Sequence, residues 1–345
     1  MKTQSTEVAV IGAGPIGIEL AVALKKEGIE YILFDKGQIA HTISWFPSMM
    51  RFFSSADRIA ISGVPIPRSD QSKCTKEEYL AYLRGIVLQF GLDIHNYENV
   101  NSVEPQKDGG FLLQTECFGS KRSYKAKKVV LVTGGTDEPR YLDIPGEDMP
   151  HVSHYFDDPH IYFQRKLLVV GGKNSAVETA LRCHHAGADV TLSYRGKQLK
   201  KKSVKYWLLP EFMGLAKRGE IRYLSDTVPK AITTGKVVLT KNNTGEDFEV
   251  EADFVLLLTG YKADMSIFKN AGVSLSEYGE APEIDERTME SNIPGLYVAG
   301  TAVAGTQDSY KLFIENCHIH VDRILASITG KKPPDSEHPY EDLES

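Results

Sequence analysis

Glycines spaced for nucleotide binding occur early in the chain, directly after a run of apolar residues. Gly12, Gly14 and Gly17 follow the apolar residues 8–11. In such a turn the first glycine permits a tight bend, and the second lets the backbone approach a pyrophosphate. The third lets the following helix lie close to the strand, and the helix N-terminus offers backbone N–H groups to phosphate oxygens. The spacing therefore predicts a dinucleotide site.

An acidic residue extends this first pattern. Asp35 ends the second predicted strand, where a carboxylate takes ribose hydroxyls in dinucleotide-binding folds. Residues 7–37 thus read as strand, glycine turn, helix and strand. The alternative is a structural turn whose glycines serve packing alone.

A second turn of this kind lies in residues 165–196. Its frame is Gly171, Lys173 and Ala176, so lysine replaces the middle glycine and alanine, an accepted variant, replaces the last. The lysine departs from the usual pattern, although its charge could help to hold a phosphate. The chain therefore contains one internal repeat, a pair of strand–turn–helix–strand units.

The second strand–turn–helix–strand pattern ends in a basic residue, whereas the first ends in the acidic Asp35. Its second strand finishes with Tyr194 and Arg195, and four lysines follow, namely Lys197, Lys200, Lys201 and Lys202. Because an arginine pairs with a 2′-phosphate that an acid would repel, the pattern favours NADPH over NADH. A solvated basic loop is the alternative.

Two such units predict two nucleotides that face each other. This arrangement suits hydride transfer from a nicotinamide to a flavin, in which the cofactors carry the chemistry and the protein positions them. Because the hydride step requires no side-chain acid or base, no catalytic residue is assigned.

The elements that must position these turns can be read from the remaining patterns. Alternation of polar and apolar residues predicts small antiparallel meanders at 103–134 and 230–258. Strands followed by Thr-Gly or Gly turns are predicted near Thr133, Gly260 and Gly300.

Composition narrows the class of protein. A chain of 345 residues predicts two domains, and its net charge of −6 argues against general nucleic-acid binding. We expect no signal peptide and no transmembrane span. The four cysteines form no C-x-x-C and have no metal-ligand spacing, so we expect free thiols, a cytoplasmic location and no metal site.

These segments together resemble the two-dinucleotide-binding flavoprotein superfamily, which includes the thioredoxin reductases. Within it they are similar to the YpdA-type bacillithiol disulfide reductases, over nearly the whole chain. The similarity rests on FFSSADRIAI (52–61), VVGGKNSAVETAL (169–181), SVKYWLLPEF (203–212) and LFIENCHIH (312–320).

The resemblance implies an α/β fold with two Rossmann-like dinucleotide-binding domains, for FAD and for NADPH, the second inserted in the first. The expected domains are 1–147 and 263–330 for FAD and 148–262 for NADPH, with a polar tail at 331–345. The expected cofactor-binding residues are Gly12, Gly14, Pro15, Ile16, Gly17, Asp35, Lys36, Trp45, Phe46, Thr133, Gly134, Gly171, Gly172, Lys173, Asn174, Ser175, Ala176, Tyr194, Arg195, Gly260, Gly300, Thr301, Lys311 and Phe313.

The chain departs from the family at three places. Ile16 stands where the YpdA-type enzymes typically have a cysteine, and Thr301 replaces the usual acid after YVAG. Cys183 stands alone where thioredoxin reductases have a C-x-x-C, and we expect it to pack as a small apolar residue. Cys317 falls in the flavin-side segment and is either near the flavin or buried and inert. His318 and His320 there either donate protons or satisfy backbone groups.

The resemblance implies an NADPH-dependent FAD oxidoreductase that passes electrons to a low-molecular-weight disulfide or another acceptor. The alternatives are a flavin-dependent monooxygenase, a ferredoxin-type NADP reductase, and a non-catalytic nucleotide-binding redox sensor in which Lys173 blocks NADPH. We expect a homodimer or homotetramer and neither nucleic-acid nor membrane partners.

Overall fold

The computed structural model describes residues 4–307 and 312–334. The chain divides into two compact units. The first unit comprises Met1–Trp45, Met49–Glu138 and Lys262–Ser345, and the second comprises Phe46–Ser48 and Pro139–Tyr261. The second unit therefore interrupts the chain of the first.

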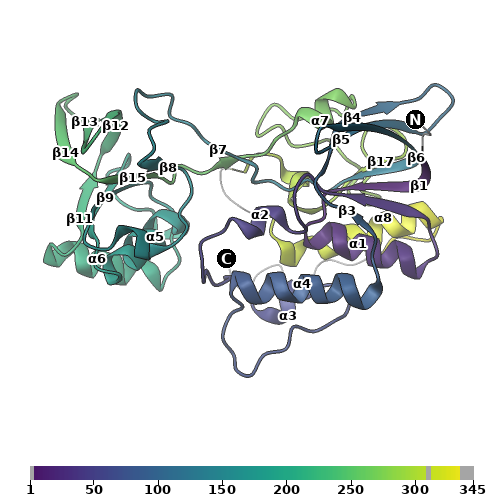
Figure 1. Ribbon diagram of the computed structural model, residues 1–345, viewed down its shortest axis with the longest axis horizontal. Helices are drawn as coiled ribbons and strands as arrows, with labels where there is room; N and C mark the ends of the chain where they lie inside the picture. Colours follow the sequence, from purple (N-terminus) through teal and green to yellow (C-terminus); the bar gives the residue numbers. More distant parts are fainter. Residues whose placement is uncertain (1–3, 308–311, 335–345) are drawn as a thin grey trace. The chain divides into compact units, whose positions relative to one another are not determined.

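A parallel sheet forms the centre of the first unit (Figure 1). Its strands are β1 (Gln4–Ile11), β2 (Tyr31–Phe34), β3 (Ile94–His95), the second half of β6 (Ser120–Leu131), and β17 (Leu296–Val298). The order is β3-β2-β1-β6, with β17 on the far side of β6, and Val10 of β1 pairs with Leu33 and Val130. The apolar run of β1 is buried because both faces of this sheet are covered.

Helices cover one face of this sheet and a meander covers the other (Figure 1). The helices are α1 (Pro15–Lys26), α4 (Lys76–Phe90) and α8 (His318–Thr329). The meander consists of β4 (Glu98–Pro105), β5 (Phe111–Cys117) and the first half of β6, all antiparallel. Shorter elements are α2 (His41–Ser44), α3 (Ala56–Ile59), α7 (Ser266–Asn270), η3 (Gly300–Ala304) and η4 (Ile314–Asn316).

Local sequence explains where α4 begins and ends. The Thr75 hydroxyl accepts a hydrogen bond from the Glu78 N–H, and the Glu78 carboxylate accepts one from the Thr75 N–H. This capping box satisfies two backbone donors that the first helical turn leaves unpaired. Gly91 then ends the helix in the left-handed conformation that glycine adopts without strain.

The second unit contains another parallel sheet, in the order β11-β10-β9-β15-β8. Its strands are β8 (Val152–Ser153), β9 (Lys166–Val170), β10 (Asp189–Tyr194), β11 (Arg222–Ser225) and β15 (Phe254–Leu257). Alternate residues of β9 face opposite cores: Leu167 and Val169 pack with the helices, and Leu168 and Val170 pack with the meander.

Two helices and an antiparallel meander cover the two faces of this second sheet (Figure 1). The helices are α5 (Asn174–His185) and α6 (Leu208–Arg218), and the meander strands are β12 (Thr227–Thr233), β13 (Lys236–Lys241) and β14 (Asp247–Glu251). The short helices η1 (Pro159–Tyr162) and η2 (Lys201–Ser203) lie in the loops. Where the chain passes between the units, β7 (Glu138–Pro139) pairs with β16 (Tyr261–Lys262).

These observations confirm the predicted fold class of two α/β units, the second interrupting the first, and both predicted meanders. Across the described residues, no helix combines the length and apolar character needed to cross a membrane.

Candidate functional site

The predicted glycine turns lie at the carboxyl ends of parallel strands in both units. In the first unit Gly12, Asp35 and Gly300 follow β1, β2 and β17. In the second unit Gly171 and Arg195 follow β9 and β10. Ligands of open α/β sheets bind at this edge, so each unit presents its chemistry where a nucleotide would lie.

Backbone packing dictates two of the three glycines in the first turn. Gly12 has φ of 113°, and a Cβ placed on it would lie 2.3 Å from the carbonyl oxygen of Val132. A Cβ on Gly17 would lie 1.9 Å from the carbonyl oxygen of Gly12. Neither position can accept a side chain unless the backbone moves, because real Cβ contacts are longer than this.

The middle glycine has a different reason to be there. Gly14 has an ordinary φ of −73°, and a Cβ placed on it would meet nothing within 4 Å. Beside it, the N–H groups of Ile16 and Gly17 precede the first helical hydrogen bond, from Ile18 N–H to the Gly14 carbonyl. The space and the unpaired donors fit a pyrophosphate, which needs close backbone approach and N–H groups.

Asp35 is more enclosed than a simple ribose ligand would be. Its side chain is 8% exposed, and its two oxygens accept hydrogen bonds from Ala13 N–H and Gly37 N–H, both at 2.8 Å. Burial raises the pKa of Asp35 above its ordinary value, although these backbone donors oppose the shift. The carboxylate thus fastens the first turn to the loop after β2, and ribose hydroxyls would use its remaining lone pairs.

Neighbouring predicted residues are also engaged. Pro15 occupies the first position of α1, where its missing N–H costs nothing. Lys36 forms an ion pair with Asp137. Ile16 is only 5% exposed, and its side chain lies beside Gly300, where a placed Cβ would be 3.7 Å from the Ile16 Cβ. The protein alone therefore buries Ile16.

Two further turns face each other at this edge of the first unit. A Cβ on Gly134 would lie 4.0 Å from the Thr301 hydroxyl oxygen, and one on Gly135 would lie 3.0 Å from the Thr301 carbonyl oxygen. Gly300 adopts φ of 69°, and its N–H donates to Nδ1 of the buried His320 at 3.2 Å. His320 thus satisfies a backbone group, as one of the two sequence interpretations expected.

The remaining predicted residues are dispersed. Trp45 is half-buried in the first unit, whereas Phe46 belongs to the second unit, where the neighbouring Ser48 N–H donates to the Asp157 carbonyl at 2.9 Å. Gly260 follows β15 and accepts a hydrogen bond from Arg140 N–H at 2.9 Å. Phe313 is exposed at the start of η4, and Lys311 lies outside the described residues.

An aromatic ring closes the second turn. A Cβ on Gly172 would lie 2.2 Å from ring carbons of Tyr194, and one on Gly196 would lie 2.7 Å from the same ring. The Tyr194 ring therefore packs between two glycines. Gly171 repeats the constraint at Gly12, because a Cβ there would lie 2.6 Å from the carbonyl oxygen of Leu258.

The start of α5 presents polar residues. Lys173 is the N-cap residue and is exposed, as is Ser175, whereas Ala176 is buried. The Asn174 side-chain oxygen accepts a hydrogen bond from Lys205 N–H at 2.7 Å, which ties the helix to the segment after η2. The N–H groups of the first turn of α5 precede Val177, the first residue to bond within the helix.

Arg195 directly follows β10, the neighbour of β9 in the sheet, and is exposed. Among the residues that the structure describes, its guanidinium makes no hydrogen bond or ion pair, although its carbonyl accepts one from the Asn242 amide at 2.9 Å. Four exposed lysines follow it, Lys197, Lys200, Lys201 and Lys202. Such a group of cations is available to an anionic ligand.

Cys183 and Cys317 are poorly placed to be reactive thiols. Cys183 is fully buried in the helix-side core of the second unit, as predicted, and burial raises its pKa to about 12. Cys317 is also fully buried, and burial together with the charge of Glu19 raises its pKa. Both thiols are held protonated, which is unfavourable for a nucleophile.

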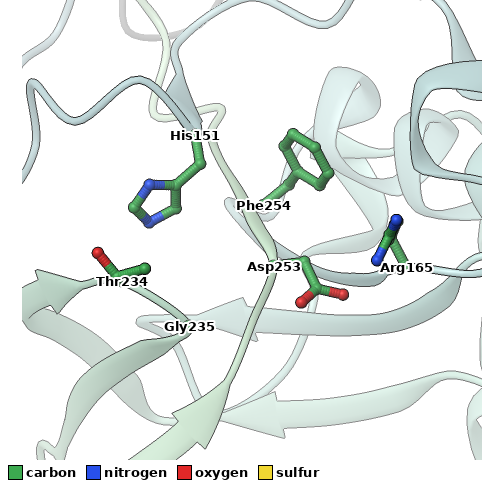
Figure 2. A pocket seen from close by; sticks show the side chains of 6 residues that line it. All are labelled: His151, Arg165, Thr234, Gly235, Asp253 and Phe254. Atoms are coloured by element: carbon green, nitrogen blue, oxygen red, sulfur yellow. The ribbon is translucent and has the colours of Figure 1, made fainter.

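One open cavity of about 340 Å³ lies at the opposite edge of the second sheet (Figure 2). It is lined by His151, Arg165, Thr234, Gly235, Asp253 and Phe254. Arg165 precedes β9 and Phe254 begins β15, so the cavity lies at the amino ends of the strands. It is therefore separate from the edge where a nucleotide would bind.

Three glycines that shape the site were not predicted from the sequence. Gly37 supplies an N–H to Asp35, Gly135 allows the close approach of the Thr301 turn, and Gly196 supports the Tyr194 ring. The only signal was that each glycine directly follows a predicted site segment, which is too common to identify a role.

Comparison with known proteins agrees with this geometry. Residues 9–300 match the family described as pyridine nucleotide-disulphide oxidoreductase. The chain is 34% identical over 323 residues to bacilliredoxin reductase Bdr of Bacillus subtilis (strain 168), covering 94% of this chain and 97% of that protein.

Solved structures show the same likeness. The bacillithiol disulfide reductase Bdr (YpdA) from Bacillus cereus superposes with a TM-score of 0.90 at 35% identity, covering 95% of this chain and 99% of the other. T. acidophilum thioredoxin reductase superposes with a TM-score of 0.74 at 20% identity, covering 95% and 99%, which shows the shared fold alone. The chain therefore belongs to the pyridine nucleotide-disulphide oxidoreductase family and is an NAD(P)H-dependent flavoprotein oxidoreductase.

Proposed function

We propose that the protein is an NADPH-dependent FAD oxidoreductase whose acceptor is a low-molecular-weight disulfide. The observation that carries the cofactor assignment is the opposite chemistry of the two turns. The first turn is fastened to a buried carboxylate, Asp35, and the second is followed by an exposed guanidinium, Arg195. A carboxylate accepts hydrogen bonds from ribose hydroxyls, whereas a guanidinium pairs with a 2′-phosphate.

In this proposal the first unit binds FAD. The open space at Gly14 accepts the pyrophosphate, and the N–H groups of Ile16 and Gly17 donate to its oxygens. The facing turns at Gly134 and Thr301 hold the flavin end together with the half-buried Trp45. Backbone groups do most of this binding, which is consistent with the lack of an acid at position 301.

The second unit binds NADPH in this proposal. N–H groups of the first turn of α5 donate to the pyrophosphate, with Lys173 beside them. Arg195 and the lysines after it pair with the 2′-phosphate. The Tyr194 ring, already held between Gly172 and Gly196, provides a flat apolar surface next to that phosphate.

When bound, NADPH and FAD would supply hydride transfer from nicotinamide to flavin, so that one NADPH and one proton reduce one disulfide to two thiols. The chain's own residues bind and orient the two nucleotides. Ile16 has no thiol, so no mixed disulfide with the chain forms at that position. The names of the relatives, bacilliredoxin reductase and bacillithiol disulfide reductase, support a disulfide acceptor.

The acceptor is tested by following NADPH oxidation by the purified protein with bacillithiol disulfide, oxidised bacilliredoxin, ferredoxin and oxygen in turn. The proposal predicts fast oxidation with a disulfide and two thiols formed for each NADPH consumed. Oxidation that is fast only with ferredoxin or only with oxygen would instead favour a ferredoxin-type reductase or a monooxygenase.

A further inference from the structure

Two exposed aromatic side chains lie together: Tyr97 follows β3 and bonds to the loop after β2, and Phe118 lies between β5 and β6. The ring centroids of Tyr97 and Phe118 are 5.6 Å apart, and the ring planes are inclined by 30°. Tyr97 is 45% exposed and Phe118 is 84% exposed. Scattered exposed aromatics are common, but two exposed rings in contact offer a ligand more aromatic surface than a single ring does.

The backbone at both positions disfavours an aromatic residue. Tyr97 has φ of 58° and Phe118 has φ of 46°, in the left-handed region that bulky residues rarely adopt. Phe118 and Gly119 form the two-residue turn between β5 and β6, where Cys117 pairs with Ser120 and both φ angles are positive. This is a type I′ turn, for which Asn-Gly is strongly preferred.

The local turn chemistry therefore gives no reason for phenylalanine at position 118. A residue held in an unfavourable conformation on the surface points to a requirement outside the turn itself. Tyr97 also has a positive φ, and its side chain is half-exposed, so its conformation likewise points to a requirement outside the local backbone.

The pair is fixed close to Asp35. The Tyr97 N–H donates to the Gly37 carbonyl and the Glu98 N–H donates to the Asp35 carbonyl, both at 2.9 Å. Glu98 is buried and accepts hydrogen bonds from the Thr115 hydroxyl at 2.6 Å, the Tyr124 hydroxyl at 2.9 Å and the Arg122 guanidinium at 2.9 Å. These bonds join β4, β5 and β6 beside the aromatic pair, so the backbone next to Tyr97 is held in place.

This location lies beyond Asp35 on the path of a dinucleotide. A nucleotide with its pyrophosphate at Gly14 and its ribose at Asp35 carries its adenine farther along, next to the loop at Gly37. Adenine has an open π-face that stacks on aromatic side chains.

We infer that Tyr97 and Phe118 form a stacking wall for the adenine of FAD and thereby select FAD over FMN. The inference rests on the proposed FAD site of the first unit. FMN lacks the adenine, so the wall contributes to binding of the dinucleotide only.

Phe118→Asn separates this role from a structural one. Asparagine before Gly119 suits the type I′ turn, so thermal stability of the flavin-free protein is unchanged or higher. Loss of stacking lowers FAD affinity about tenfold, given the usual strength of base–aromatic stacking. Affinity for FMN is unchanged. Both are measured by titrating the flavin-free full chain and following flavin fluorescence.

Two variants serve as controls. Tyr97→Phe keeps a ring and retains wild-type FAD affinity, whereas Tyr97→Asn loses affinity as Phe118→Asn does. Tyr278→Asn removes an exposed aromatic of the same unit far along the sequence and leaves FAD affinity unchanged.

Each outcome decides between the claims. Wild-type protein that binds no FAD overturns the proposed function itself. Wild-type protein that binds FAD, with Phe118→Asn binding it equally well, overturns only the stacking wall. Equal losses of affinity for FAD and FMN would show a structural role and would also overturn the stacking wall. Unchanged FAD affinity with an altered oligomeric state would overturn it too, and would assign the aromatic pair to contact with a second copy of the chain.

Discussion

The two glycine turns share a framework but differ at two of three positions, and the differences separate the demands of the fold from those of the ligand. Gly12 and Gly171 are equivalent, because a Cβ on either would lie 2.3 or 2.6 Å from the carbonyl oxygen of the residue that follows a paired strand, Val132 after β6 or Leu258 after β15. The fold therefore requires glycine at the first position in both units.

The third position depends on how closely the helix approaches its turn. A Cβ on Gly17 would lie 1.9 Å from the Gly12 carbonyl oxygen, whereas the second unit carries Ala176 with its Cβ in place. The middle position depends on the ligand, because Gly14 faces open space and Lys173 is exposed. Nothing in the protein requires glycine there.

The largest effect in this comparison is expected for Gly17→Ala. The added methyl group overpacks the first turn and lowers the free energy of unfolding by about 3 kcal/mol. The reverse change in the other unit, Ala176→Gly, costs about 1 kcal/mol because glycine weakens a helix. Chemical denaturation of both variants checks this, and similar losses in the two units would remove the distinction.

Gly14→Ala should act on the ligand and not on the fold. The methyl group enters the space assigned to the pyrophosphate and weakens hydrogen bonds from the backbone to a charged group, so FAD affinity falls about tenfold or more. Stability of the flavin-free protein changes by less than about 1 kcal/mol, since only a helix N-cap is altered. A variant that binds FAD normally would contradict the assignment of this space.

Arg195→Ala should act on the second unit alone. Loss of a charge-assisted pair with the 2′-phosphate raises the KM for NADPH by about ten- to a hundredfold, while the KM for NADH stays the same. Arg222→Ala, which removes an exposed arginine on the neighbouring strand, is the matched control. Steady-state kinetics with both nucleotides measures the effect, and equal changes for NADPH and NADH would exclude Arg195 as the phosphate reader.

The smallest effects are expected at two glutamates in equivalent positions, Glu19 in α1 and Glu178 in α5. The group whose pKa is shifted is the partner of Glu19, His318, in the first unit and Glu178 itself in the second. Glu19 faces Nδ1 of His318 at 2.7 Å, and Nε2 of His318 faces the Arg58 carbonyl at 3.0 Å. Burial lowers the pKa of His318, but the bond and charge of Glu19 outweigh it, so this pKa is raised above 6.5. Burial raises the pKa of Glu178 above 4.5, partly opposed by Arg182.

His318 and Glu178 both bind a proton more tightly in the folded than in the unfolded state. Their contribution to stability is complete below the unfolded pKa and is lost as pH rises through the folded pKa. His318→Gln should therefore remove a fall in stability above pH 6.5, and Glu178→Gln one above pH 4.5, each about 1 kcal/mol or less. Denaturation across pH checks both, and unaltered pH profiles would contradict the assignments.

Residue spacing was sufficient to predict the elements that repeat a local pattern. The glycine turns, the helices after them and both meanders depend on contacts near in sequence, so their patterns are visible in the chain. Asp35, predicted as the last residue of the second strand, lies directly after Phe34, the last residue of β2, for the same reason.

Contacts between distant segments could not be predicted. The two backbone donors of Asp35, the burial of Ile16 beside Gly300, and the pairing of Tyr97 with Phe118 all depend on how the sheet and the meander close on each other. A single sequence carries no periodic signal for such contacts, because the partners share no spacing.

Hydride transfer from NADPH to the flavin is tested most directly by excluding air, adding NADPH or NADH to the purified flavoprotein, and following the flavin absorbance. We expect rapid bleaching with NADPH, much slower bleaching with NADH, and loss of this preference in Arg195→Ala. A flavin that neither nucleotide bleaches would contradict hydride transfer between the two proposed sites and favour a non-catalytic sensor.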